Sequence, residues 1–164
     1  MPVRPTTDFA KTGLFNMLNQ RLSLEGAAVL DLYAGTGNIS YELISRGAGS
    51  LIAVDVDKHC VAFIEKTFKL LQASVAEACR YDAITFLEMC SQSIDLIFEE
   101  PPYEHSPVEL IVEMVMKRSL LNSNGLLVIE HSSKTNYRQH QNLMMDRKYG
   151  AVAFSIFVAD KSIS

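Results

Sequence analysis

The chain has 164 residues, of which 48% are hydrophobic and 21% charged, a composition typical of one globular domain with its own core. No apolar run approaches the roughly 20 residues of a membrane-spanning helix, and the N-terminal residues lack the apolar segment of a signal peptide. The net charge of −4 and the isoelectric point near 5.5 argue against a protein that binds nucleic acid through its overall charge. A local basic patch remains conceivable around two sets of residues: Arg4, Lys11 and Arg21, or Arg138, Arg147 and Lys148.

Short apolar runs alternate with longer amphipathic stretches along the chain. Residues 9–20 predict a first helix, with Thr7 or Asp8 as its N-cap. We then expect strands at 27–33, 51–54, 74–81, 94–98, 125–131 and 151–159, and helices at 39–46, 57–71 and 108–120. The strand at 74–81 rests on the surrounding pattern, because its own alternation is weak. Tyr149-Gly150 predicts a turn between two antiparallel strands. Strand and helix in this alternation predict an α/β fold around a mainly parallel sheet, in a single domain spanning 1–164.

Cysteine usage indicates a reducing compartment. Cys60, Cys79 and Cys90 are odd in number and include no CxxC spacing, so neither a complete disulfide set nor a zinc site is expected. The location expected is the cytoplasm, with the thiols buried.

The first chemical motif follows the strand at 27–33. Asp31, Tyr33, Ala34, Gly35, Thr36 and Gly37 form an acid-headed glycine turn. Ser40 stands where a dinucleotide-binding fingerprint has its third glycine, and no P-loop lysine is present. The segment resembles motif I of the class I methyltransferases, in which Asp31 would meet the methionine end of the cofactor. A purely structural strand-to-helix turn is the alternative.

Carboxylates follow the next two strands. Asp55 can accept hydrogen bonds from both hydroxyls of a ribose, while Asp57 suits the N-cap of the next helix. Val56 lies between them and is counted with the cofactor site. Asp82-Ala83 is placed to meet an adenine ring, and capping the following helix is an equally good role for Asp82.

The most specific motif is Glu99-Glu100-Pro101-Pro102-Tyr103 at the end of the strand at 94–98. An exocyclic base amine is a poor nucleophile, since its lone pair is delocalised into the ring. The Glu100 side chain and a proline carbonyl can hold its two N–H bonds, and Tyr103 can stack on an extruded base. Such catalysis works mainly by positioning and requires no metal.

Together these motifs resemble the bacterial RsmD-like methyltransferases, which act on guanine N2 of small-subunit ribosomal RNA. The resemblance covers nearly the whole chain and rests on these segments: Arg4-Pro-Thr-Thr-Asp8, Leu14-Phe-Asn16, Asp31 to Gly37, Ser45-Arg-Gly-Ala48, Asp82-Ala83 with Phe86-Leu87, and Asp95-Leu-Ile-Phe with Pro101-Pro-Tyr103. It implies a Rossmann-like class I fold with a seven-stranded sheet, helices on both faces and an antiparallel C-terminal strand. It also implies S-adenosylmethionine as cofactor, ribosomal RNA or the small ribosomal subunit as partner, and contact between Glu100 and the target amine.

The sequence departs from the family pattern at several positions. Glu100 stands where the family has Asp, and related amine methyltransferases Asn, which moves the carboxylate by about 1.5 Å, one C–C bond. Thr12 replaces an acid on the first helix, and Thr67 a helical Asn. The basic segment that the family carries before Arg4 is not seen here, and residues 1–24 are expected to form an N-terminal helical segment.

Two alternatives to an RNA methyltransferase remain open. One is a catalytically impaired or non-catalytic binding protein with a methyltransferase fold, which the change at Glu100 suggests. The other is an amine methyltransferase for DNA adenine or protein glutamine, since these use similar Pro-Pro-Tyr loops. His105, after the motif, could line the mouth of the substrate site.

Overall fold

The structure is a computed structural model and describes residues 7–102 and 107–160. In these residues the helices are α1 (Asp8–Asn19), α2 (Asn38–Ser45), α3 (Lys58–Leu70), α4 (Ala83–Met89) and α5 (Val108–Lys117). The strands are β1 (Ala28–Leu32), β2 (Ser50–Asp55), β3 (Ala76–Arg80), β4 (Ile94–Glu99), β5 (Leu121–Ser132), β6 (Leu143–Tyr149) and β7 (Val152–Phe157). All seven strands belong to one sheet in the order β3-β2-β1-β4-β5-β7-β6. The expected α/β fold with a seven-stranded sheet is confirmed.

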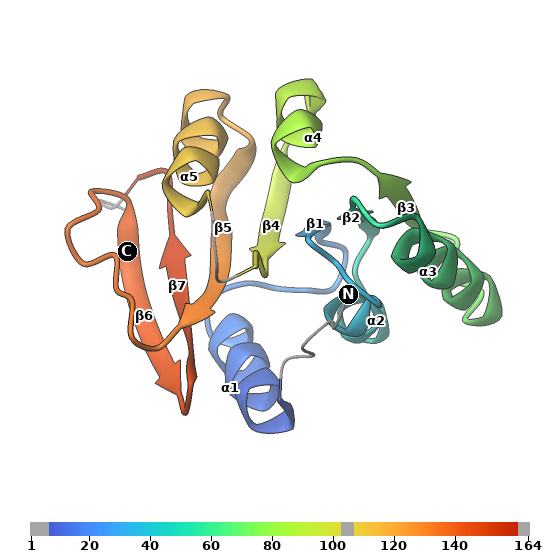
Figure 1. The fold of residues 1–164 in the computed structure, drawn as a ribbon, viewed down its shortest axis with the longest axis horizontal. Coiled ribbons are helices and arrows are strands. Elements are labelled where there is room, and N and C mark those ends of the chain that lie inside the picture. Colours follow the sequence, from blue (N-terminus) through green and yellow to red (C-terminus); the bar gives the residue numbers. More distant parts are fainter. Residues whose placement is uncertain (1–6, 103–106, 161–164) are drawn as a thin grey trace.

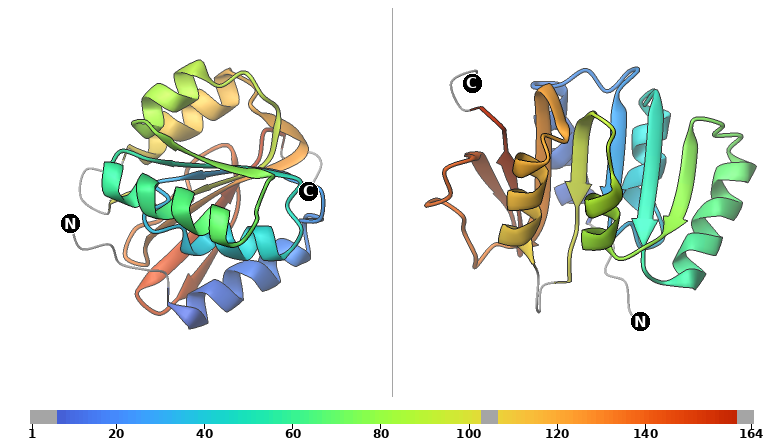
Figure 2. Two further views of the ribbon diagram at one scale, coloured as in Figure 1. Left: turned by 90° about the vertical axis from the view of Figure 1, so that its right-hand side faces the viewer. Right: turned by 90° about the horizontal axis from the view of Figure 1, so that it is seen from above.

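The sheet lies between two layers of helices. Helices α1, α2 and α3 cover one face, and α4 and α5 cover the other (Figures 1 and 2). Side chains alternate between the faces along each strand, so Val29 packs with the α1–α3 layer while Leu30 and Leu32 pack with the α4–α5 layer. Burial on both faces explains why the parallel strands are continuous apolar runs in the sequence.

Strand directions place the ligand-binding edge. Strands β1 to β5 are parallel where they pair, and β7 is antiparallel to both β5 and β6. Strands β2 and β3 follow one another on one side of β1, whereas β4 and β5 lie on its other side. The topological switch point therefore lies between β1 and β4. In open α/β sheets, ligands bind in the crevice outside the carboxyl ends of the strands at such a point.

Several local expectations are confirmed. The side chain of Thr7, and not that of Asp8, caps α1 by accepting from the Ala10 N–H at 3.2 Å. Strand β3 exists within the ambiguous 74–81 segment. Gly150 has a φ of 66° and lies in the expected turn between β6 and β7.

Other bounds were wrong for local reasons. The helix expected to reach 120 ends at Lys117, and Ser119 then takes a left-handed φ of 52°. Strand β5 begins at Leu121, four residues before the expected start, because its pairing with β4 shifts register between Ile94 and Leu96 and absorbs the extra residues. The last strand ends at Phe157 instead of 159. Helix α4 was missed as an element, since seven residues are too few to show a clear helical period.

Gly13 marks a close approach between α1 and the β6–β7 hairpin. A Cβ on Gly13 would overlap Cε1 and Cζ of the Tyr149 ring. Gly13→Ala is therefore expected to lower the free energy of unfolding by about 1–3 kcal/mol, although Gly→Ala within a helix ordinarily raises it by about 1 kcal/mol. Urea unfolding monitored by circular dichroism measures this. Thr12→Ala, at the exposed neighbouring position, is the control, and stabilisation by both changes would contradict the packing described here.

Candidate active site

The predicted site residues meet at one edge of the sheet. Those that the structure describes lie in the last residues of β1 and β2 or in the segments that follow β1, β2, β3 and β4, and these parallel strands all end at the same edge. The arrowheads of β2, β3 and β4 point toward this edge in the right-hand view of Figure 2. A backbone hydrogen bond of 3.4 Å from the Glu100 N–H to the Leu32 carbonyl joins the loop after β4 to the end of β1. The glycine turn and the Glu-Pro-Pro segment are thus neighbours at the switch point.

The glycine turn after β1 has the tight geometry its sequence predicts. Tyr33, Gly35 and Gly37 have φ values of 56°, 59° and 89°. The left-handed φ of Gly37 favours glycine, and a Cβ there would lie 2.6 Å from the Tyr41 hydroxyl, which would have to shift. The Tyr41 hydroxyl also donates to the Thr36 carbonyl at 2.6 Å, which fixes the turn from the side of α2.

Asp31 is a buried carboxyl group beneath this turn. The Ser40 hydroxyl donates to its Oδ2 at 2.6 Å. Burial raises the pKa of Asp31 from 3.8 to about 7, a hydrogen bond from Ser40 acts in the opposite direction, and the Asp55 charge raises it further. Near neutral pH the group is therefore poised between its two forms, and a nearby cation would favour the ionised one. Ser40 belongs to the candidate site through this hydrogen bond, and the sequence reasoning missed it, having considered the position only as a missing glycine.

Asp55 holds two loops in place with its two oxygens. Oδ2 accepts from the Gly35 N–H at 2.8 Å and Oδ1 from the Asp57 N–H at 2.9 Å. Asp57 caps α3, as expected, by accepting from the His59 N–H at 2.7 Å and the Cys60 N–H at 3.3 Å. These contacts orient the Asp55 carboxylate at the strand end, and each oxygen keeps acceptor capacity for a ligand.

The ends of β2 and β3 carry exposed apolar side chains beside polar ones. Val56 is 62% and Tyr81 41% exposed, so apolar surface lies open at this edge of the sheet. The Tyr81 N–H bonds the Asp55 carbonyl at 3.1 Å, so the two strand ends are linked. Asp82 caps α4 by accepting from the Thr85 N–H at 3.2 Å. Of the two roles considered for Asp82, the cap is therefore observed.

The strand end before the prolines contains a second buried acid. Glu99 is fully buried, and neither of its side-chain oxygens has a hydrogen-bond partner among the described residues. Burial raises its pKa well above the usual value. Pro101 is buried and Pro102 exposed. The predicted site residue Tyr103, together with His105, lies outside the described residues.

Sequence reasoning assigned no role to Glu99, although a signal for its burial existed. Ile97 packs in the α4–α5 layer, and side chains two residues apart in a strand share a face. The alternation therefore places Glu99 toward the same buried layer. A carboxyl group there is the unexpected feature of the site.

Other expectations can be compared with the described residues. Only Cys90 is buried; Cys60 and Cys79 are partly exposed, so the expectation that all three thiols are buried was wrong. Within these residues there is no group of three or more potential metal ligands, and no helix is long and apolar enough to cross a membrane. Of the first basic set, Arg4 lies outside the described part, and Lys11 pairs with Glu42 at 3.5 Å. The second set, Arg138, Arg147 and Lys148, is exposed.

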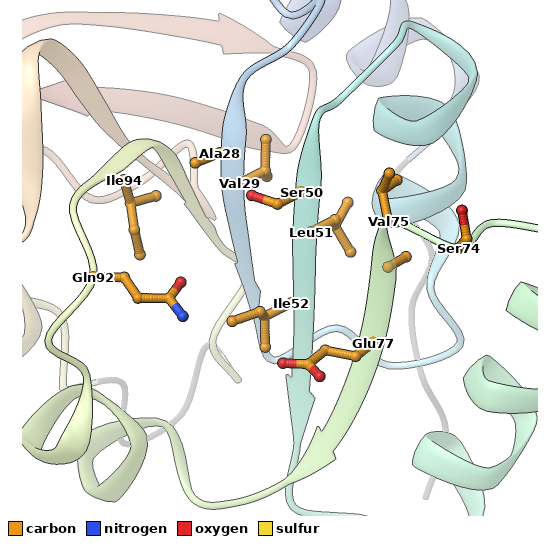
Figure 3. A pocket seen from close by; sticks show the side chains of 11 residues that line it. Ala28, Val29, Ser50, Leu51, Ile52, Ser74, Val75, Glu77, Gln92 and Ile94 are labelled. Carbon is orange, nitrogen blue, oxygen red and sulfur yellow. The ribbon is translucent and has the colours of Figure 1, made fainter.

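One hollow in the surface, of about 210 Å³, lies away from this edge. Its lining includes Ala28, Ser50, Val75 and Ile94, at the amino ends of the strands, and Figure 3 shows Glu77 and Gln92 among the side chains around it. It takes no part in the arrangement described above.

Comparison with known proteins identifies the family of the chain. A family model described as "Conserved hypothetical protein 95" matches residues 1–158. The chain belongs to this family. The expected resemblance to RsmD-like methyltransferases is thereby confirmed.

Two curated relatives and one solved structure illustrate the family. "Ribosomal RNA small subunit methyltransferase D" of Buchnera aphidicola is 27% identical over 134 residues, covering 82% of this chain and 68% of that protein. "Putative rRNA methyltransferase YlbH" of Bacillus subtilis is 30% identical over 161 residues, covering 94% and 86%. The structure described as "Putative methyltransferase yhhF" from Escherichia coli has a TM-score of 0.82 at 25% identity, covering 94% of this chain and 86% of that one.

Proposed function

We propose that this family member is an S-adenosylmethionine-dependent methyltransferase whose substrate is an exocyclic base amine, guanine N2 of small-subunit ribosomal RNA. The observation that carries the proposal is the junction of two loops at the switch point, where the Glu100 N–H meets the Leu32 carbonyl. One loop has the features of a nucleoside-cofactor turn, and the other has those of an amine-positioning segment. The names of the relatives from Buchnera and Bacillus support ribosomal RNA as the substrate. With such a substrate, the cytoplasm is the compartment we propose.

The residues at the edge of the sheet fit an S-adenosylmethionine molecule. The turn of Tyr33, Ala34, Gly35, Thr36 and Gly37 would border the methionine portion, with Asp31 facing its α-amino group. Asp55 would accept from the ribose hydroxyls, and the exposed side chain of Val56 would cover one side of the adenine. Asp82 and the Ala83 N–H would meet the adenine edge. The fit is supported by Asp31, a buried acid poised to ionise beside a cation, and by apolar surface left open beside Asp55.

The chain's own part in the reaction is to hold the amine in line with the methyl group. When bound, the cofactor supplies a methyl group on a sulfonium that is already a good leaving group. The Glu100 carboxylate and a proline carbonyl would accept the two N–H bonds of the amine, so that its lone pair points at the methyl carbon. Pro101 and Pro102 stiffen this segment. Tyr103 would stack on the base.

The length of the Glu100 side chain gives the first test of this role. If the extra methylene misplaces the carboxylate, Glu100→Asp should raise kcat, by as much as about 10²-fold, because a misplacement of about 1 Å can cost that factor. Glu100→Gln should lower it, since the carboxylate's negative charge is lost. The measurement is transfer of labelled methyl groups to unmodified small ribosomal subunits, with the affinity for S-adenosylmethionine determined separately and expected not to change.

Glu109→Asp is the matched control, because it shortens an exposed acid on α5 by the same methylene. A Glu100→Asp rate equal to a measurable wild-type rate would contradict the proposed handicap. Absence of transfer by every variant, with S-adenosylmethionine still bound, would favour the alternative of a binding protein with a methyltransferase fold.

A further inference from the structure

Glu99 is a buried acid that the proposed reaction leaves without a role. Its exposed fraction is 0%, and both Oε1 and Oε2 lack a hydrogen-bond partner within the described residues. Burying a carboxylate in this state is costly, whereas burying a neutral carboxyl group costs much less. The raised pKa of Glu99 agrees with a neutral group in the free protein. An apolar side chain would fill the same space without that cost, so a bound partner of Glu99 would explain the carboxyl group.

The titratable groups around Glu99 do not provide that partner. Tyr33, which follows β1, and Tyr137, which follows β5, both have pKa values raised by their burial and then by the Glu99 charge. Beyond them lie two further acids, Asp82 acting on Tyr33 and Glu109 acting on Tyr137. Neither phenol donates a hydrogen bond to Glu99, and a neutral phenol has no positive charge to offset that of a carboxylate.

The neighbouring strands also supply no cation. In the register of the sheet, Glu99 lies beside Leu32 of β1 and Ile129 of β5, which are both apolar. His131, two residues beyond Ile129, has its ring nitrogens engaged with the Ser132 carbonyl at 2.8 Å and the Ser155 hydroxyl at 2.7 Å. Its pKa is lowered by burial, so it is neutral near pH 7. No ion pair among the described residues includes Glu99.

Glu99 nevertheless ends a strand at the crevice where the cofactor is proposed to bind. Asp31 and Glu99 lie on the two strands that border the switch point, with Asp31 opposite Phe98 and Glu99 opposite Leu32. S-adenosylmethionine has two positive charges, on its α-amino group and on its sulfonium. S-adenosylhomocysteine has the amino group and a neutral sulfur. Asp31 is proposed above for the amino group, and the Glu100 carboxylate for the target amine. Glu99 is then the acid at the end of β4 that has no proposed partner, and the sulfonium is the remaining positive charge.

We propose that Glu99 is the counter-charge of the sulfonium, protonated in the free protein and giving up its proton when S-adenosylmethionine binds. This inference rests on the proposed function. S-adenosylhomocysteine has no positive charge on its sulfur, so its binding leaves Glu99 protonated. The residue thereby makes the protein distinguish the methyl donor from the demethylated product, and it does so more strongly at higher pH.

The direction of the pH dependence follows from linkage. Between the pKa of Glu99 in the complex and its raised pKa in the free protein, binding of S-adenosylmethionine releases a proton. In that range its affinity rises with pH relative to that of S-adenosylhomocysteine, by up to about tenfold per pH unit. Protons released by Asp31 are common to both ligands and cancel in the comparison.

Isothermal titration calorimetry of the whole chain tests this, with both ligands in buffers of different ionisation enthalpy. At about pH 6.5 the α-amino groups of both ligands stay protonated. We expect S-adenosylmethionine to release up to about one proton more than S-adenosylhomocysteine. Glu99→Gln should abolish this excess and make the affinity ratio of the two ligands independent of pH. Glu109→Gln, an exposed acid on α5, should keep both.

Each outcome has a distinct meaning. Equal proton release for both ligands in the wild type overturns the inference without any variant, and so does an excess that persists in Glu99→Gln. The proposed function survives either result, because both ligands still bind. Failure of the folded wild type to bind either ligand overturns the proposed function and this inference with it.

Discussion

Asp55→Ala is expected to weaken binding of S-adenosylmethionine and S-adenosylhomocysteine by about 10²- to 10⁴-fold. In the proposed complex the carboxylate accepts from two ribose hydroxyls, and hydrogen bonds to charged groups contribute about 1.5–3 kcal/mol each. The substitution also removes the acceptors of the Gly35 and Asp57 N–H groups, which hold the two loops of the site. Both ligands contain the ribose, so both should lose affinity by the same factor. Calorimetric titration measures the two dissociation constants.

A neighbouring acid separates this effect from general damage. Asp57→Ala removes the cap of α3 and should lower the free energy of unfolding by about 1 kcal/mol, with little change in ligand affinity. Urea unfolding shows whether each variant is folded. If Asp55→Ala does not fold, Asp55→Asn takes its place in the binding measurement. Retention of wild-type affinity by folded Asp55 variants would remove Asp55 from the ribose site.

Asp31→Asn is expected to stabilise the free protein at alkaline pH. The folded pKa of about 7 lies above the usual 3.8, so the folded state binds more protons than the unfolded state between these values. The stabilising contribution of protonated Asp31 is therefore complete below about pH 3.8 and is lost as pH rises through about 7. This lowers the free energy of unfolding by an amount on the order of 4 kcal/mol. Asparagine resembles the protonated acid and can still accept from Ser40. The free energy of unfolding of the variant should equal that of the wild type at about pH 4 and exceed it at about pH 8.

Urea unfolding at these two pH values measures the difference between Asp31→Asn and the wild type. Asp95→Asn is the control, because Asp95 oxygens accept from the Ala28 N–H at 2.9 Å and the Asn122 side chain at 2.8 Å. An amide there cannot match both donors, so this variant should lose stability. A wild-type protein whose difference from Asp31→Asn does not change with pH would contradict the account of Asp31. If Asp31 also contacts the α-amino group of S-adenosylmethionine, Asp31→Asn should bind this ligand more weakly as well as being more stable at alkaline pH.

The features of the fold and the site that depend on local sequence or on strand order could be predicted from the sequence. Buried parallel strands are apolar on both faces, so β1, β2 and β4 were visible as continuous runs ending in polar residues. The caps Thr7 and Asp57 were visible because capping is local, acting within three residues. The position of the site followed from the topology, since parallel strands share a carboxyl edge.

What the sequence did not predict depends on tertiary contacts. The Ser40–Asp31 hydrogen bond joins a helix to a strand, and no local pattern marks it. The difference between the adjacent acids Glu99 and Glu100 depends on where β4 ends and on which layer covers it. The close approach of Gly13 to Tyr149 joins segments far apart in the chain. Short α4 and the early start of β5 are set by packing and by an irregular strand pairing.

The most direct test of the proposed function is the identity of the methylated product. Small ribosomal subunits lacking their own modifications would be incubated with the protein and labelled S-adenosylmethionine, and the RNA digested to nucleosides for mass spectrometry. We expect the label in N2-methylguanosine, with none when S-adenosylhomocysteine is in large excess. Label in another nucleoside or in protein would contradict guanine N2 as the target. No label at all, from protein that binds S-adenosylmethionine, would contradict the proposed activity on this substrate.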